Sequence, residues 1–307
     1  MATAAHRPPT LSFERAWQDF VVHRRAENMS PRTLNAYRVA AHQLLAYLTS
    51  AGLPTEPLEI TRQGVQEFIT HVVETRSAAT ASTRYWGLRA FFNWLVDEGE
   101  IDHSPLERVR PPRQEERPPD VLSDEEVLAL LHASEGRSFE DRRDAAIIRL
   151  LFDTGARVGE LVSMSMDRVN IGEGTARVMG KGRRERDLAF GMKTAKDLTR
   201  YLRLREGHRL AEVPQFWLGW HGPLTESGVA QALKARAERA GLDAAKVHPH
   251  ILRHTFADRW KAAGGSEEDL MSLGGWRSPT AMRRYGSSLA AARAREAHHR
   301  LSPGDRL

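Results

Sequence analysis

Residues 141–164 read DRRDAAIIRLLFDTGARVGELVSM. The apolar run before Gly155 predicts a buried helix. Glycine tolerates the left-handed backbone that ends a helix, so we expect a turn at Gly155 and a second helix after it. Arg157 stands where that second helix begins, and free backbone amides and a guanidinium there point the same way. The stretch therefore predicts two helices joined by a glycine turn, where Arg157 is either an anion-binding residue or a surface arginine.

On the C-terminal side of this stretch the chain changes character. Residues 167–190, DRVNIGEGTARVMGKGRRERDLAF, form short β-branched runs split by glycines, which predicts a small antiparallel meander. On the N-terminal side, SDEEVLALLHAS begins with a capping box from Ser123 to Glu126. Further helices are expected at 193–206, 225–240, 250–263, 266–273, 278–284 and 289–299.

Residues 11–103 show helical periodicity throughout, beginning with a helix from Phe13 to Arg25. We expect a bundle of about four helices, the last with Trp86, Leu88 and Phe91 on its apolar face. Residues 108–120, RVRPPRQEERPPD, are rich in proline and charge, and they predict an extended linker. The predicted fold is mainly α with a small antiparallel β-sheet: an N-terminal helical bundle and a C-terminal mixed α+β domain.

The composition excludes several classes of protein. The chain has 307 residues, enough for two domains, and no cysteine, which excludes disulfides, cysteine-based zinc sites and cysteine nucleophiles. No run approaches the roughly 18 apolar residues of a membrane span, and the opening MATAAHRPPT lacks the apolar segment of a signal peptide. We therefore expect a cytoplasmic protein with no membrane partner.

The net charge of +5 is unevenly distributed along the chain. Residues 1–109 carry 11 basic and 12 acidic residues, whereas residues 110–307 carry 34 basic and 28 acidic ones. Arginine outnumbers lysine 39 to 6; a GC-rich genome would give this bias, but the forked guanidinium also suits phosphate. The positive second part favours a nucleic-acid partner.

Four separate stretches carry polar residues that a hydrophobic core does not need. In chain order they supply Arg157, Lys181 at a glycine-flanked hairpin tip, His250 with Arg253 on one helix face, and Trp276 with Tyr285. Each stretch alone has a plainer explanation: a surface arginine, an ordinary turn, satisfied or solvated histidines, and core aromatic residues. A zinc site is disfavoured, because the histidines have no cysteine and no carboxylate at HExxH spacing.

Taken together, these stretches resemble the tyrosine recombinase (phage integrase) family. The resemblance rests on TGARVGEL, GKGRRER, HILRH and LGGW in this order, with Tyr285 nine residues after the tryptophan. SPRTLNAYRVAAHQLLAYL also resembles the core-binding bundle of the family. The resemblance implies a core-binding, SAM-like domain at 11–107, a linker at 108–120, and a catalytic domain with a tail helix at 121–302.

The resemblance also implies roles for the site residues. Tyr285 would be the nucleophile, which needs assistance because a phenol with a pKa near 10 stays protonated at neutral pH. Arg157 and Arg253 would hold the non-bridging oxygens of one phosphodiester. His250 would assist proton transfer from the tyrosine, and Lys181 would protonate the departing 5′-oxygen. Neither a metal nor a cofactor is expected, because the arginines supply the positive charge.

Supporting roles are expected for further residues. Trp276 stands where many members have histidine, and its indole N–H can only donate a hydrogen bond to the phosphate. Glu160, one turn after Arg157, either orients the site or is a solvated helix carboxylate. The residues expected to contact DNA are Arg32, Arg84, Arg89 and Arg183.

The predicted function is site-specific DNA recombination through a 3′-phosphotyrosine intermediate by a bacterial or phage-encoded enzyme. Two duplexes need four active sites, so the resemblance implies a homotetramer on double-stranded DNA that is a monomer or dimer off DNA, with accessory recombination factors as optional partners. The tail helix, with a thin apolar stripe, would dock on a neighbouring protomer or else be frayed. The alternatives are a type IB topoisomerase-like nicking and religating protein, a non-catalytic DNA-binding module, and a helical enzyme acting on small anions.

Overall fold

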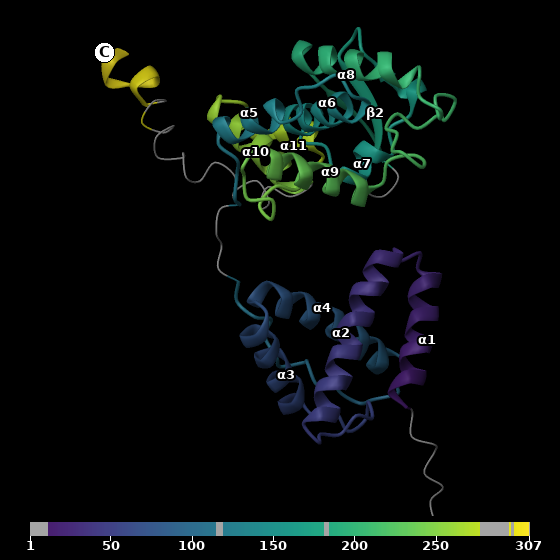
Figure 1. The fold of residues 1–307 in the computed structure, drawn as a ribbon. Helices are drawn as coiled ribbons and strands as arrows, with labels where there is room; N and C mark the ends of the chain where they lie inside the picture. The colour runs from purple at the N-terminus through teal and green to yellow at the C-terminus, as the bar shows by residue number, and fades with distance from the viewer. Residues whose placement is uncertain (1–11, 115–118, 181–183, 277–294, 296–297, 307) are drawn as a thin grey trace, which may run out of the picture. The chain divides into compact units, whose positions relative to one another are not determined.

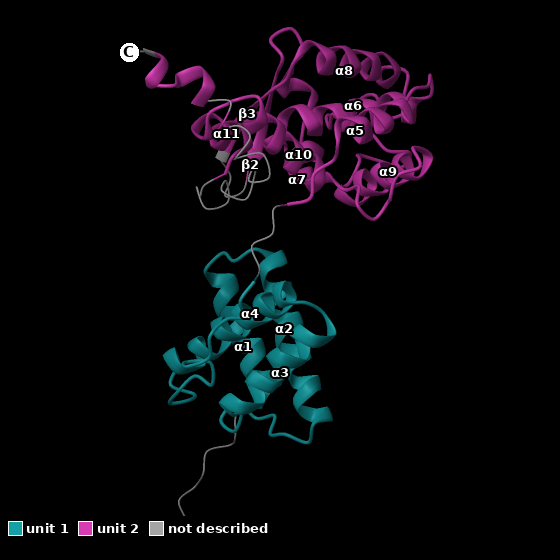
Figure 2. Cartoon of the chain, turned by 90° about the vertical axis from the view of Figure 1, so that its left-hand side faces the viewer, with its two compact units in different colours: residues 1–115 teal, residues 116–307 magenta. Residues whose placement is uncertain are grey.

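A computed structural model of the protein describes residues 12–114, 119–180, 184–276, 295 and 298–306. The chain divides into two compact units, residues 1–115 and 116–307 (Figure 2). The division falls within the stretch 108–120. Val109 is buried in the core of unit 1, and its carbonyl accepts a hydrogen bond of 2.8 Å from the hydroxyl of Tyr85. The end points of the two domains stay predictions.

Unit 1 is a helical bundle (Figure 1). In its described residues the helices are α1 (Phe13–Ala26), α2 (Pro31–Ser50), α3 (Arg62–Thr75) and α4 (Ala78–Asp97). Each begins after a hydroxyl residue whose side-chain oxygen accepts a backbone N–H three residues later, which satisfies one of the free amides of the first turn. Phe91 of α4 is central to the core, with its ring centroid 5.2–5.6 Å from those of Phe13, Trp17 and Phe20.

The prediction that Trp86 shares the apolar face of α4 is wrong. Its side chain is 51% exposed, whereas Leu88, Phe91 and Leu95 are completely buried. The three buried residues are spaced by three and four, so they occupy one side of the helix. Trp86 precedes Leu88 by two residues, which corresponds to about 200° around a helix of 3.6 residues per turn. Its ring therefore points away from the core.

Unit 2 combines helices with a small sheet, so the predicted fold class is confirmed (Figure 1). Its described helices are α5 (Asp124–His132), α6 (Phe139–Thr154), α7 (Val158–Val162), α8 (Met192–Arg205), α9 (Glu226–Arg239), α10 (Pro249–Ala262) and α11 (Glu267–Gly274), with short 3₁₀ turns at Met166–Arg168 and Gly304–Arg306. The capping box of α5 is present: the backbone N–H of Glu126 donates to Ser123 Oγ, and that of Ser123 donates to Glu126 Oε2.

The buried helix α6 lies at the centre of unit 2 and packs against α8 and α10. The predicted meander is a three-stranded antiparallel sheet in the order β1 (Val169–Asn170), β2 (Thr175–Gly180), β3 (Arg184–Ala189), and it contacts α7 through β2 and α11 through β3. The register pairs Val178 with Arg186 and Gly180 with Arg184. This arrangement brings the inner face of β3 close to α7 and α11, where the candidate site residues gather.

Two of the expected helices fall wholly or mostly outside the described residues. The one at 278–284 lies there entirely, and the one at 289–299 lies there except for residues 295, 298 and 299. Among the described helices, none is both long enough and apolar enough to cross a bilayer.

Candidate active site

Arg157 is the residue that begins α7, as the glycine turn predicts. Helix α6 ends at Gly155, whose φ of +57° lies in the left-handed region. A Cβ at this glycine would lie 2.3 Å from a ring carbon of Phe256 on α10. Both the backbone angle and the close approach of α10 therefore require glycine here. The turn delivers Arg157 with its side chain 34% exposed.

Glu160 is the hub of the charged groups in the site. Its side chain is 3% exposed, so it is not the solvated helix carboxylate that the sequence left open. It accepts hydrogen bonds from the backbone N–H and Nη1 of Arg157, both at 2.8 Å. Burial by itself would raise the pKa of Glu160, but the hydrogen bonds and charges of Arg186 and Arg157 outweigh it and hold the pKa below its ordinary value. The carboxylate is therefore ionised at neutral pH and fixes the first arginine.

Arg186 completes this network; it ends the stretch GKGRRER, but no role in the site was predicted for it. From β3 it donates through Nε and Nη2 to the two oxygens of Glu160, at 3.2 and 2.7 Å, and through Nη1 to the carbonyl of Leu273. Alternation along a strand could have revealed it, because Arg186 and the buried Leu188 are two residues apart and share a face. An arginine on the buried face of a strand needs an acidic partner.

Arg253 approaches the same place from α10 and is 3% exposed. Its Nη1 donates to the carbonyl of Gly155 and its Nη2 to that of Gly274, the latter at 2.7 Å. The ring of Trp276 covers the guanidinium, with 3.6 Å between Cζ and the ring centroid, in a cation–π contact. The structure thus places the second arginine of the candidate set directly beneath the tryptophan.

The two arginines meet at the C-terminal end of α11. Arg157 Nη2 donates to the carbonyl of Gly275 at 2.6 Å, and Arg253 donates to the carbonyl of the preceding residue. Gly275 ends α11 with a φ of +65°, which exposes these carbonyls to the arginines. The C-terminus of a helix carries partial negative charge, so it is a suitable anchor for guanidinium groups. Four residues predicted from separate stretches therefore lie together in the structure: Arg157, Glu160, Arg253 and Trp276.

His250 and His254 lie one turn apart on α10, with ring centroids 6.0 Å apart. His250 is exposed and lies one turn before Arg253. Burial, followed by the electrostatic influence of the neighbouring His250 and Arg253, lowers the pKa of His254 to about 4, so this ring is neutral at physiological pH. His248 precedes the first residue of α10 and caps the helix: its Nδ1 accepts the backbone N–H of Ile251 at 3.1 Å.

Three predicted site residues, Lys181, Arg183 and Tyr285, lie outside the described residues. Another tyrosine, Tyr201 of α8, is completely buried. Its hydroxyl donates to the carbonyl of Phe216 at 2.9 Å and accepts the N–H of Leu218 at 3.0 Å. Burial raises the pKa of Tyr201 to about 12. These contacts exclude Tyr201 as a nucleophile. In the described part of the chain, no group of three or more His, Asp or Glu side chains is arranged to hold a metal ion.

The predicted DNA-contacting arginines of unit 1 lie on α2 and α4. Helix α2 contains no acidic residue, and α4 contains only Asp97 at its end. Arg32 is exposed in the first turn of α2, where the helix dipole disfavours a cation, so helix stability does not explain it. Arg89 donates to the hydroxyl of Tyr85 at 2.9 Å, and its guanidinium lies over the ring of Trp86.

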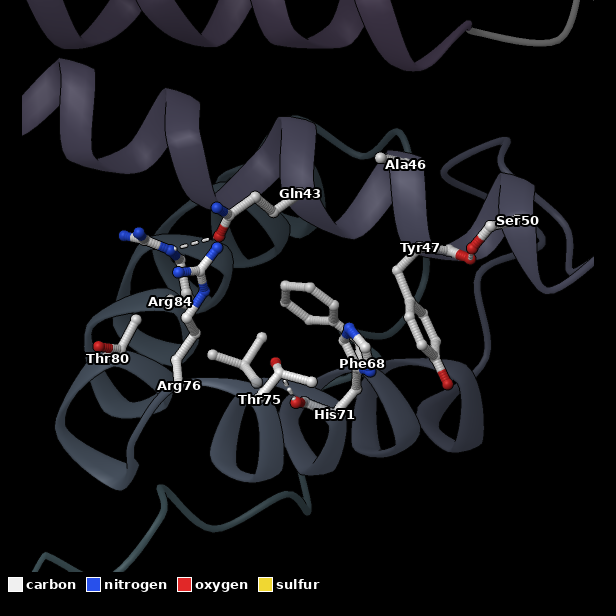
Figure 3. Close-up of a pocket in the computed structure, with 11 residues that line it drawn as sticks. Gln43, Ala46, Tyr47, Ser50, Phe68, His71, Thr75, Arg76, Thr80 and Arg84 are labelled. Carbon is white, nitrogen blue, oxygen red and sulfur yellow. Dashed lines mark hydrogen bonds between the residues drawn. The ribbon is translucent and has the colours of Figure 1, made fainter.

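Arg84 lies at a groove between α2, α3 and the start of α4, with a volume of about 730 Å³ (Figure 3). Its Nε donates to Gln43 Oε1 at 2.7 Å, and Arg76 lies next to it on the same wall (Figure 3). No Asp or Glu is among the residues that line the groove. The two guanidinium groups therefore give this wall a positive charge that suits an anion.

Models of known protein families and curated proteins match most of the chain. Residues 120–291 match the model of the phage integrase family, and residues 17–100 match that of the phage integrase N-terminal SAM-like domain. The chain is 30% identical to a tyrosine recombinase XerD of Listeria monocytogenes over 252 residues, covering 80% of this chain and 84% of the relative. It is also 30% identical to a tyrosine recombinase XerC of Pseudomonas fluorescens over 247 residues, covering 80% and 81%.

Solved structures show the same fold. The XerH site-specific recombinase bound to palindromic difH substrate superposes with a TM-score of 0.74 and 19% identity, covering 94% of this chain and 84% of that one. A lambda integrase dimer bound to a COC′ core site gives a TM-score of 0.69 at 18% identity, covering 90% and 77%. The family match spans more than half of the sequence, and the chain therefore belongs to the phage integrase family of tyrosine recombinases.

Proposed function

We propose that this protein is a site-specific DNA recombinase that cleaves and rejoins DNA through a 3′-phosphotyrosine at Tyr285. The observation that carries the proposal is the meeting of Arg157 and Arg253 at the end of α11. Two guanidinium groups from distant parts of the sequence share one backbone anchor, directly before Trp276 and nine residues before Tyr285. Such a pair suits one phosphodiester with two non-bridging oxygens.

The arginines would make the phosphorus easier to attack. Arg157 is partly exposed, so DNA can reach its guanidinium. Arg253 is buried, and a positive charge in a low-dielectric setting acts more strongly on a nearby phosphate than it would in water. Glu160 keeps Arg157 oriented through two hydrogen bonds, so little reorganisation is needed when negative charge develops on the phosphate.

The reaction balances without an outside reagent. The Tyr285 hydroxyl loses its proton and attacks phosphorus, the bond from phosphorus to the 5′-oxygen breaks, and Lys181 gives that oxygen a proton. We assign proton transfer from Tyr285 to His250, which lies one turn before Arg253; His254, with its low pKa, is less suited to hold that proton. A 5′-hydroxyl from another strand then reverses the attack and releases the tyrosine. The phosphodiester energy is retained, so strands are exchanged rather than hydrolysed.

The partner is double-stranded DNA, which Arg32, Arg84, Arg89 and Arg183 would contact along the phosphate backbone. Exchange between two duplexes requires four active sites, and one of the similar solved structures is a lambda integrase tetramer bound to a Holliday junction. We infer a homotetramer on DNA, with accessory recombination factors as further partners, acting in the bacterial cytoplasm.

The test is a suicide duplex carrying the target site with a nick next to the scissile phosphate, incubated with the full-length chain. A denaturation-resistant adduct together with exchanged strands supports recombination. Relaxation of supercoiled DNA without exchange would indicate a topoisomerase, and tight binding without an adduct would indicate a non-catalytic binding module.

The matched pair of variants is Tyr285→Phe and Tyr201→Phe. Each removes one phenolic hydroxyl. The first is expected to abolish the adduct while leaving binding nearly intact, because most affinity comes from phosphate contacts elsewhere. The second is expected to form the adduct at the normal yield. An adduct that persists in Tyr285→Phe would place the nucleophile at another residue.

A further inference from the structure

Helix α4 presents an uncharged stripe to solvent. Its exposed residues Ala79, Thr83, Trp86 and Asn93, with the half-buried Ala90, follow the spacing i, i+4, i+7, i+11, i+14 and so occupy one face. Trp86 is the large apolar side chain of this face and is 51% exposed. Nothing in the core of unit 1 accounts for it, because the buried face of α4 lies on the other side of the helix.

The ring of Trp86 is fixed in position by a chain of contacts. The guanidinium carbon of Arg89 lies 5.7 Å from its ring centroid, and Arg89 Nη1 donates to the hydroxyl of Tyr85 at 2.9 Å. Tyr85 is completely buried and donates in turn to the carbonyl of Val109. The ring of Tyr85 also packs edge-on against that of Trp86, with centroids 5.1 Å apart. The exposed tryptophan is therefore preorganised, which lowers the entropic cost of covering it with a partner.

The charges around this face identify the partner. Helix α4 carries Arg84 and Arg89 and no acidic residue before Asp97, and the adjoining α2 has none at all. A surface of this kind attracts a polyanion, while a large apolar ring at its centre needs an apolar group to contact. The major groove of DNA offers both: it admits an α-helix between two phosphate backbones, and each thymine displays its C5-methyl group there.

We propose that Trp86 is a specificity-determining residue that contacts thymine methyl groups in the major groove of the target site. This inference rests on the proposed function, since it requires that unit 1 bind duplex DNA. Arg89 would hold the ring and contact a phosphate beside it. Burying one methyl group contributes about a fourfold gain in affinity, so the site should contain a thymine whose methyl group matters by that factor.

The experiment begins with selection of duplexes from a random library by the full-length chain. In the selected site, each thymine is then replaced singly by deoxyuridine, which removes only the methyl group. Wild type is expected to bind about fourfold more weakly to at least one such duplex, and Trp86→Ala is expected to bind the thymine and uracil versions equally. Val22→Ala is the matched control, because Val22 is an exposed apolar residue of the same unit at 67% exposure; it should keep the wild-type response.

Two results would overturn the inference. Either wild type binds every uracil-substituted duplex as tightly as the thymine duplex, or Trp86→Ala keeps the full methyl dependence of binding. The wild-type measurement needs no variant. A wild type without methyl dependence therefore overturns the inference even if Trp86→Ala folds poorly. A chain that selects no duplex would defeat the proposed function as well, whereas a selected site without methyl dependence removes the thymine contact alone.

Discussion

Replacing Glu160 tests whether the charged network at the start of α7 holds the candidate site together. The carboxylate is 3% exposed and joins Arg157 to Arg186, whose side chain is only 13% exposed. Glu160→Ala would leave Arg186 as a buried, uncompensated charge, which costs about 3–5 kcal/mol. Glu160→Gln keeps one acceptor oxygen but removes the charge, and a loss of about 2 kcal/mol is expected.

The pH dependence follows from the direction of the pKa shift. The pKa of Glu160 in the folded chain is below its ordinary value of 4.5. A carboxylate with a lowered folded pKa stabilises the fold above its unfolded pKa and loses that contribution as the pH falls through the folded value. The difference in unfolding free energy between wild type and Glu160→Gln should therefore be constant above about pH 5 and shrink at lower pH.

The assay is urea unfolding of the full-length chain, fitted as two transitions because the chain has two units. Asp187→Asn is the matched control: it makes the same change from acid to amide, but Asp187 pairs with Arg177 on an exposed face of β3, with both side chains more than half exposed. Its midpoint should not move measurably. Adduct formation by Glu160→Gln should also fall, by about 100-fold, because Arg157 loses its orientation. Equal unfolding midpoints for the two variants would refute this reasoning.

Three further outcomes are expected. Tyr201→Phe leaves the buried N–H of Leu218 without its hydroxyl acceptor, while the carbonyl of Phe216 keeps Nε of Arg205, so unit 2 should lose about 1–2 kcal/mol in urea unfolding; an unchanged midpoint would contradict the described contacts. Cleavage of the suicide duplex should proceed at the same rate in EDTA, because the arginines supply the positive charge; recovery only after adding Mg²⁺ would argue otherwise. Residues 116–307 alone should bind the target more weakly and with a shallower dependence of log K on log salt than the full chain, because the phosphate contacts of unit 1 are gone; identical slopes would show that unit 1 makes no such contacts.

Local patterns predicted most of the fold. Helical periodicity predicted the bundle, the serine before α5 predicted its capping box, and Gly155 predicted the turn that positions Arg157. These features depend on residues only a few positions apart, so the sequence displays them directly. The structure confirms the fold class, and the comparisons confirm the family.

The misses have two physical causes. Arg186 joins the site because β3 passes beside α7 and α11, and strand alternation was the sole local sign of it. Trp86 was placed in the core because it is apolar, although its spacing from Leu88 and Phe91 puts it on another side of α4. Glu160 could not be distinguished from a solvated carboxylate until its distant partner was known. Contacts between residues far apart in the chain decide the cases of Arg186 and Glu160, whereas the spacing within α4 decides that of Trp86.

The close fit of Trp276 over the end of α11 limits how the enzyme can be engineered. A Cβ at Gly274 would lie 1.6 Å from a ring carbon of Trp276, so even alanine would push the indole off Arg253. Gly275, with its φ of +65°, resists substitution for a second reason. Residues 274–276 therefore behave as a single block that libraries for altered target choice should leave intact. No such close packing restricts the solvent-facing stripe of α4. Substitutions introduced there would change which DNA the enzyme selects without disturbing the chemistry it performs.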